Sequence, residues 1–370
     1  QMTEHSSITT HCRSEKSVSS GISSGLKEYQ LIRRLASGFR RSPAQINPLF
    51  GSDSEIIRLQ ECGDNLIALT TDGIVEEIQQ GLYRDPFLVG WMTVMVNLSD
   101  LAAVGARPVG ILIQLNLPPD ADEQLHSGLR QGIEAACRKC GTFVLGGDTN
   151  SSSQLSTGGT AIGILPEGRT VSRKGCRPGD LLYTTTPAGL GAAFAFRQIS
   201  GGDGESLEYQ PTARLNEGNV VREFASTCLD TSDGLIPGLA QLAFVNDTGF
   251  ELTTSYREIL HPSAQALASQ AGFPSWFMLA GPHGDFELLF TISAGNEAEF
   301  LDTANSIGWT PLCLGIVISD GLVLDVGTDR PARTNATLIA NLFPEADGDA
   351  GAYLESLGSF HKALIERETI

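Results

Sequence analysis

One stretch of the sequence, between Asp85 and Pro108, constrains the fold more than any other. Asp85 is a good helix N-cap, Pro86 suits the first helical position, and apolar residues follow at helical spacing. Gly105 closes the helix, and Pro108 prevents it from resuming. The pattern therefore predicts a long helix whose apolar stripe packs into a core. That stripe includes Leu88, Trp91, Met95 and Leu98.

The second half of this helix carries an acidic residue where burial is expected. Asn97 and Asp100 are three residues apart and share a helix face, yet residues 96–103 are otherwise apolar enough to be buried. A buried carboxylate without partners is strongly disfavoured as an anion and takes up a proton instead. Asp100 therefore points to a polar or metal site inside the fold.

Other aspartates occur where a predicted strand ends or a helix begins. They are Asp53 after Gly51-Ser52, Asp72 after Thr70-Thr71, Asp148 after Gly146-Gly147, and the pair Asp230 and Asp233 around Ser232. Any one of them is more often a turn residue or a helix cap. Six such positions, one of them inside an apolar helix, strain a purely structural explanation. Carboxylates that converge repel one another unless cations lie between them, and Mg²⁺ prefers carboxylate, phosphate and water oxygens.

Composition excludes several classes of protein. The 25 Lys+Arg against 43 Asp+Glu give a net charge of −18, so we expect no nucleic-acid partner. The absence of a run near eighteen apolar residues argues against a membrane span. Seven scattered cysteines and the lack of an apolar leader predict a cytoplasmic protein. The motifs of P-loop NTPases, Rossmann dehydrogenases and GxSxG hydrolases are missing.

Alternating strand and helix signals predict an α+β (mixed α/β) fold in two domains. We expect a disordered Ser-rich tail over residues 1–27, an N-terminal metal- and ATP-binding domain over 28–166, and a C-terminal α+β domain over 167–345. The domain boundary falls in a polar segment punctuated by glycine and proline. Residues 346–370 show no clear pattern and are separated as a C-terminal extension.

Five segments together carry a family resemblance. In chain order they read VNLSDLAAVGARP (96–108), GGDT (146–149), SRKGCRPGD (172–180), DTSDGL (230–235) and GDFELLF (284–290). The set resembles the aminoimidazole ribonucleotide synthetase superfamily, and most closely its thiamine-monophosphate kinase branch. The resemblance covers roughly residues 28 to 325.

This resemblance implies a homodimer in which the N-terminal sheets pair into a shared β-barrel, with a sandwich-like α/β domain at the C-terminus. ATP would lie between the two domains, and the mechanism would be in-line phosphoryl transfer without an assigned general base. The family positions that hold Mg²⁺ fall on Asp53, Thr70, Asp72, Asp100, Asp148, Asp230 and Asp233. Those that contact the nucleotide fall on Gly147, Asp148, Arg173 and Ser232.

The acceptor side departs from the family pattern. Ser52 replaces the first Asp of a GDD motif, and the family's GGEDYEL reads PHGDFEL here, with Gly284 in place of the acidic residue. A family histidine falls on Gln79, and Glu77 adds negative charge nearby. The candidate acceptor-side residues are Gln79, His283 and Asp285.

Three hypotheses therefore stay open. The first is an ATP- and Mg²⁺-dependent phosphotransferase acting on a small-molecule acceptor, with thiamine phosphate the nearest named one. The second is an enzyme that activates an amide or carbonyl oxygen by phosphorylation, as cyclo-ligases and dehydratases do. The third is a nucleotide-binding homologue that has lost turnover.

Overall fold

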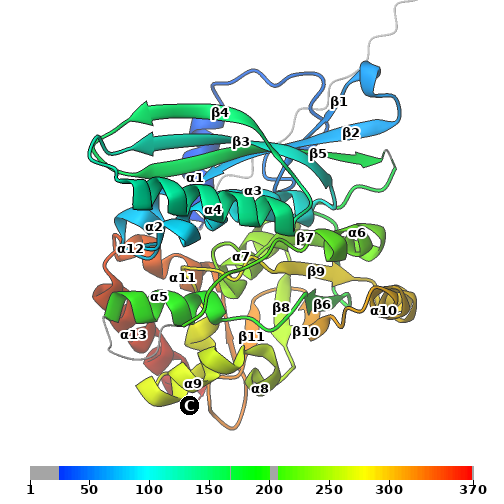
Figure 1. Ribbon diagram of the computed structural model, residues 1–370. Helices are drawn as coiled ribbons and strands as arrows, with labels where there is room; N and C mark the ends of the chain where they lie inside the picture. Colours follow the sequence, from blue (N-terminus) through cyan, green and yellow to red (C-terminus); the bar gives the residue numbers. More distant parts are fainter. Residues whose placement is uncertain (1–24, 167, 201–206, 369–370) are drawn as a thin grey trace, which may run out of the picture.

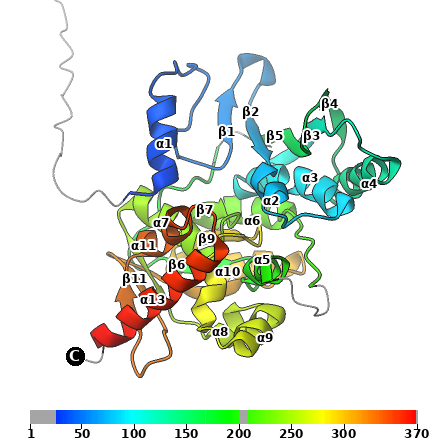
Figure 2. The ribbon, with the colours of Figure 1, turned by 90° about the vertical axis from the view of Figure 1, so that its left-hand side faces the viewer.

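The computed structural model describes residues 25–166, 168–200 and 207–368, and two β-sheets organise them. A five-stranded sheet belongs to the N-terminal half and a seven-stranded sheet to the C-terminal half (Figure 1). Figure 2 shows the N-terminal sheet and its helices above the C-terminal half. The predicted mixed α/β fold class is therefore confirmed. Of the predicted Ser-rich tail, residues 1–24 lie outside the described residues.

The N-terminal sheet has the strand order β1-β2-β5-β3-β4, and only its β3–β4 pair is parallel among the pairs described. Its strands are β1 (Glu55–Arg58), β2 (Asn65–Gly73), β3 (Arg107–Leu117), β4 (Val144–Ser151) and β5 (Ser156–Pro166). The helices of this half are α1 (Lys27–Ala36), the 3-10 helix η1 (Gln60–Cys62), α2 (Val75–Gln79), α3 (Pro86–Ala103) and α4 (Glu123–Lys139).

The C-terminal sheet has the order β12-β11-β8-β10-β6-β9-β7. Its strands are β6 (Leu181–Thr184), β7 (Ala225–Asp230), β8 (Gly249–Leu252), β9 (Leu288–Ile292), β10 (Leu312–Ile318), β11 (Leu322–Leu324) and β12 (Ala332–Thr334). The first helices of this half are α5 (Leu190–Ser200), α6 (Leu215–Phe224), α7 (Leu235–Asn246), α8 (Tyr256–Ile259) and α9 (Pro262–Ala271). The remaining ones are η2 (Ser275–Leu279), η3 (Ala294–Asn296), α10 (Glu297–Ser306), α11 (Ala336–Ala340), α12 (Leu342–Glu345) and α13 (Ala350–Glu368).

Helix α3 is the element that joins the two halves. It packs on β2, β3 and β5, runs beside α4, and also contacts α6 and β7 of the C-terminal half (Figure 1). Asp85 caps it as predicted, because its carboxylate accepts the N–H of Phe87 at 3.1 Å. Among the described helices, α3 has the length and apolar composition of a membrane span, but 78% of it is buried inside the protein. It is the core helix of the N-terminal half.

The two faces of the N-terminal sheet are covered differently. Helices α3 and α4 lie on one face, while the other face points outward (Figure 1). Large apolar side chains remain exposed on β3 and β4, among them Val109 (37%), Leu112 (41%) and Leu145 (52%). An apolar sheet surface left open to this extent is typical of an interface.

Strand β4 differs from its prediction. The sequence predicts a short strand over 142–145 that stops at Gly146-Gly147-Asp148, but β4 continues to Ser151 in parallel register with β3. A Cβ atom on Gly147 would lie 1.8 Å from the carbonyl oxygen of Ile113, so only glycine permits this approach. The glycines serve strand pairing, and Asp148 therefore lies inside a strand rather than at its end.

The segment that we separate as a C-terminal extension belongs to the core of the C-terminal half. Its helix α13 buries Tyr353, Leu357 and Leu364 in that core. The Tyr353 hydroxyl donates to the carbonyl oxygens of Ala280 and Gly281 at 3.2 and 3.0 Å. Few residues of α13 are buried, so the hydrophobic periodicity of its sequence is too weak to predict a helix.

The crossing of α3 and α4 depends on two reciprocal glycines. A Cβ atom on Gly132 would lie 2.0 Å from the Phe87 carbonyl oxygen, and one on Gly90 would lie 2.2 Å from the Leu129 carbonyl oxygen. We predict that Gly132→Ala lowers the free energy of unfolding by about 1–3 kcal/mol, because the helices must separate. Chemical denaturation of the full chain measures this change.

Gly358→Ala is the matched control, since Gly358 lies in α13 and a Cβ atom added to it would meet nothing within 4 Å. Alanine favours the helix, so this variant should gain up to about 1 kcal/mol. Equal stabilities of Gly132→Ala and the unsubstituted chain would contradict the packing argument.

Candidate functional site

Three of the predicted aspartates converge between the two halves of the molecule. Carboxylate oxygens of Asp53, Asp100 and Asp230 all lie within 4.8 Å of one another. They come from the segment before β1, from α3 and from the end of β7. The Asp53 side chain is 2% exposed and Asp230 is 6% exposed. The fold thus brings acidic residues from both halves into one buried cluster.

Polar contacts from neighbouring elements fix Asp100 and the end of β2. The Thr70 hydroxyl donates to the Asp100 carboxylate, and the Ser54 hydroxyl donates to the Asp100 carbonyl oxygen at 3.2 Å. Asn97, one turn earlier on α3, accepts the N–H of Asp72 at 3.0 Å and donates to the Asp72 carbonyl oxygen at 3.2 Å. The shared helix face of Asn97 and Asp100 therefore clamps β2 against α3.

Burial makes this cluster electrostatically costly. Burial raises the pKa of Asp100 well above its ordinary value, and the charges of Asp230, Asp53 and Asp72 raise it further. Burial, followed by the charge of Asp53, raises the pKa of Asp230 to about 7. A proton or a cation must therefore accompany these carboxylates near neutral pH.

Arg173 supplies one positive charge to the cluster. Its Nη2 donates to Asp53 Oδ1 at 2.5 Å, and its Nη1 donates to the hydroxyl of Tyr29 on α1 at 2.8 Å. Asn246 at the end of α7 holds the Arg173 carbonyl oxygen at 2.8 Å. One guanidinium cannot balance three carboxylates, so the site retains a negative excess.

The donor set fits a hard divalent cation. Asp53 Oδ2 and Asp230 Oδ2 are buried, and neither has a hydrogen-bond partner among the described residues. A buried oxygen without a partner is strongly unfavourable unless an ion or water completes it. Clustered carboxylate oxygens of this kind are ligands that Mg²⁺ takes.

Asp72 and Asp148 stand apart from this group but share a neighbouring cavity. The cavity of about 560 Å³ is lined by both residues together with Gln114, Gly147 and Thr160. Asn150 donates to Asp148 Oδ2 at 2.8 Å, and Gly73 donates its N–H to Asp72 Oδ1 at 2.7 Å. Because the charge of Asp72 also acts on Asp100, the cavity and the buried cluster are electrically connected.

The loop after β7 carries the remaining predicted residues of the C-terminal half. Ser232 is half-buried, and Asp233 is exposed with its Oδ2 3.4 Å from the Nε2 of Gln241. Gly281 packs on this loop, because a Cβ atom there would lie 2.2 Å from the Asp233 carbonyl oxygen. Asp233 therefore lies beside the buried cluster rather than in it.

His283 and Asp285, the other two predicted acceptor-side residues, both have buried side chains, and their role in acceptor binding stays a prediction. His283 is 5% exposed and lies among aromatic rings, with its Nε2 3.2 Å from the Tyr83 hydroxyl. Burial lowers the pKa of His283 to about 4. The Asp285 carboxylate accepts the N–H groups of Gly189 and Gly191 at 2.8 and 2.7 Å, next to the start of α5. The His283 ring therefore joins the two halves through Tyr83, whereas Asp285 fixes the start of α5 and also lines a cavity of about 570 Å³.

The glycine that departs from the family pattern has a packing explanation. A Cβ atom on Gly284 would lie 1.7 Å from the Thr231 carbonyl oxygen, so this loop touches the Asp230 loop directly. Gln79 is exposed at the end of α2, as an acceptor-side residue requires. Burial, together with the charge of Asp72, raises the pKa of Glu77 to about 7, which weakens the extra negative charge there.

No sequence motif indicated an apolar cavity of about 450 Å³ that adjoins the site. Its wall is formed mainly by aromatic and aliphatic side chains of α5, η2, α12 and α13, and its lining includes Gln80, Phe196, Phe277, Gly281, Phe343 and Tyr353. Gly281 also touches the Asp233 backbone, so the cavity reaches the loop of the buried cluster. Prediction was not possible because α13, which supplies one wall, has no clear sequence pattern.

Comparison with known proteins agrees with this geometry. The profile of the AIR synthase related protein N-terminal domain matches residues 51–165. The thiamine-monophosphate kinase of Methanospirillum hungatei is 33% identical over 294 residues, which cover 75% of this chain and 94% of the relative. The Escherichia coli K12 enzyme of the same name is 28% identical and covers 79% and 91%.

Solved structures share the fold. AaThiL complexed with AMPPCP and TMP superposes with a TM-score of 0.67 at 23% identity, covering 83% of this chain and 95% of that chain. The identity and coverage of the Methanospirillum relative carry the assignment. The chain belongs to the thiamine-monophosphate kinase family, a family of ATP-dependent phosphotransferases among the AIR synthase-related proteins.

Proposed function

We propose that this chain transfers the γ-phosphoryl group of ATP to thiamine monophosphate, with Mg²⁺ as the cation. The observation that carries the proposal is the buried group of Asp53, Asp100 and Asp230 in a member of this family. In the reaction, the bond between the γ-phosphorus and the ADP oxygen breaks, and a phosphate oxygen of the acceptor forms the new bond. The products are ADP and thiamine diphosphate.

The carboxylates of this chain would hold Mg²⁺ from both halves. Asp53, Asp100 and Asp230 would bind one ion, while Asp72 and Asp148 would face the phosphate chain from the adjoining cavity. The bound ions would neutralise charge that develops on the transferring group. Arg173 would exchange its single contact with Asp53 for a phosphate oxygen, because a guanidinium donates to carboxylate and phosphate oxygens alike.

The apolar cavity supports an aromatic acceptor. Its aromatic lining suits flat heterocyclic rings, and Gly281 connects it to the loop that carries Asp233. A phosphorylated amide intermediate, the second hypothesis, has no comparable support in the described residues.

We also propose that the enzyme is a homodimer that pairs through the open face of the N-terminal sheet. The exposed Val109, Leu112 and Leu145 support this arrangement, since an apolar sheet face of this kind is stabilised by a second copy. A cytoplasmic location is supported by the six described cysteines, all of which are free thiols.

The direct test is product analysis. The full chain is incubated with ATP, Mg²⁺ and thiamine monophosphate, and the mixture is resolved by chromatography. We expect one thiamine diphosphate for each ADP. Free inorganic phosphate without a phosphorylated acceptor would reject the proposed acceptor, and no consumption of ATP would favour a homologue without turnover.

The variant Asp100→Asn should change catalytic turnover and thermal stability in opposite directions. We predict a loss of ATP turnover on the order of 10²-fold or more, because a ligand to the charged phosphate and metal system is removed. At pH 8 without metal, the same variant should have a higher melting temperature, because repulsion with Asp230 and Asp53 is relieved. Turnover assays and thermal unfolding measure the two effects.

Asp302→Asn is the control for this prediction, because Asp302 lies exposed on α10 and should change neither quantity. An Asp100→Asn variant with normal turnover would refute the assignment of Asp100 as a metal ligand.

The acceptor cavity is tested by filling it. Ala192 on α5 lines the cavity, and Ala192→Phe should raise the KM for thiamine monophosphate by about tenfold or more. The affinity for an ATP analogue should stay unchanged, which steady-state kinetics and calorimetry together determine. The exposed Ala298→Phe on α10 is the size-matched control. An unchanged KM in the Ala192 variant would place the acceptor elsewhere.

A further inference from the structure

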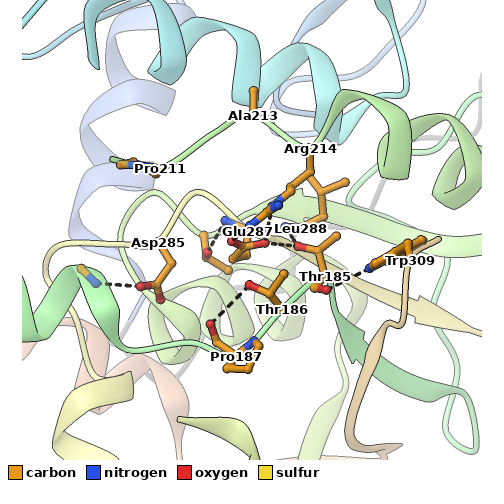
Figure 3. Close-up of polar contacts among 12 residues, drawn as sticks. Thr185, Thr186, Pro187, Pro211, Ala213, Arg214, Asp285, Glu287, Leu288 and Trp309 are labelled. Carbon is orange, nitrogen blue, oxygen red and sulfur yellow. Dashed lines mark hydrogen bonds and ion pairs between the residues drawn. The ribbon is translucent and has the colours of Figure 1, made fainter. Parts of the chain in front are cut away.

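Arg214 and Glu287 form a partly buried ion pair; Glu287 belongs to the GDFELLF segment, but no sequence motif indicated Arg214 as its partner. The Nε and Nη2 atoms of Arg214 donate to the two Glu287 carboxylate oxygens at 2.7 and 2.5 Å (Figure 3). The two side chains are 27% and 8% exposed. The Thr185 hydroxyl donates to the same carboxylate. This two-point contact fixes the orientation of the two segments as well as their separation.

On one side, the pair holds the loop that carries Asp230. The N–H of Thr231 donates to the Glu287 carbonyl oxygen at 2.8 Å, and the N–H of Glu287 donates to the Thr231 hydroxyl at 3.0 Å. Thr231 directly follows Asp230, and Asp230 itself pairs with Leu288 between β7 and β9. A displacement of Glu287 therefore displaces Asp230.

On the other side, the pair is tied to α3. Arg214 ends a segment in which the Pro211 carbonyl oxygen accepts the indole N–H of Trp91 at 2.7 Å. The N–H of Ala213 lies 3.4 Å from the sulfur of Met95, the residue one turn after Trp91 on α3. Figure 3 shows Ala213 directly below the cyan helix, with Pro211 on one side of it and Arg214 on the other. Helix α6, which begins directly after Arg214, also contacts α3.

We infer that Arg214 and Glu287 are positioning residues that set the distance between Asp100 and Asp230. One partner is anchored to the helix of Asp100 and the other to the loop of Asp230, so the pair joins the two halves of the metal site. Glu287 lies outside the group formed by Asp53, Asp100 and Asp230, and it acts on metal binding through Thr231. Residues behind metal ligands commonly act in this way. The inference rests on the metal site of the proposed function.

The test measures Mn²⁺ affinity of the full chain by electron paramagnetic resonance titration. Glu287→Gln keeps the shape of the side chain and removes its charge, so we expect Mn²⁺ to bind roughly 10- to 100-fold more weakly. Arg214→Lys can make only one of the two contacts and should weaken binding by a smaller factor. The double variant should be no weaker than Glu287→Gln, because both changes break one interaction.

Glu297→Gln is the matched control. Glu297, at the start of α10, accepts the Tyr183 hydroxyl at 2.6 Å, on the opposite side of β9 from the strand that carries Asp230. We expect its Mn²⁺ affinity to equal that of the unsubstituted chain, even where its melting temperature falls by as much as that of Glu287→Gln.

Three results would decide against the inference. Unchanged Mn²⁺ affinity in Glu287→Gln and Arg214→Lys would make the pair a contributor to stability alone. An equal loss in Glu297→Gln would indicate general destabilisation. If the unsubstituted chain does not bind Mn²⁺, both the proposed metal site and this inference are rejected. Weakened Mn²⁺ binding in a chain that does not phosphorylate thiamine monophosphate would reject the acceptor and support the positioning pair.

Discussion

Mutual repulsion among Asp53, Asp100 and Asp230 is the constraint on which the organisation of this molecule depends. Carboxylate oxygens from three separate segments lie within 4.8 Å of one another, and burial raises the pKa of Asp100 and Asp230. Such a group persists only because packing holds each segment where it is. Arg173 relieves part of the charge, and the remaining negative charge is what supports the proposed binding of a divalent cation.

Helix α3 explains how the two halves hold this arrangement. It supplies Asp100, its Asn97 clamps the end of β2, and it contacts α6 and β7 of the C-terminal half. Its glycine-mediated crossing with α4 covers one sheet face and leaves the other open. Viewed from the side in Figure 2, the α3 region lies between the N-terminal sheet and the C-terminal half. The proposed metal binding therefore depends on how the two halves are aligned, and we infer that the Arg214–Glu287 pair maintains that alignment.

The proposed acceptor cavity and the carboxylate cluster differ in the interactions that they offer a ligand. Charge dominates at the carboxylates, whereas the neighbouring cavity of about 450 Å³ is apolar and aromatic. The loop between them changes composition for packing reasons, since Gly284 lies against Thr231 and His283 fills an aromatic cluster. A departure from a family motif at such a loop does not by itself indicate a change of acceptor.

Short-range patterns in the chain were enough to predict the local features of this protein. The N-cap at Asp85, the length of α3, most strands and the acidic residues at the edges of elements all depend on neighbours in sequence. Which aspartates meet could not be predicted in this way, because convergence depends on how distant segments pack: Asp53, Asp100 and Asp230 come together, while Asp148 lies in β4. Helix α13 could not be predicted either, because its few buried residues give only a weak hydrophobic periodicity. The ion pair of Arg214 and Glu287 joins residues 73 positions apart, so it too depends on tertiary packing.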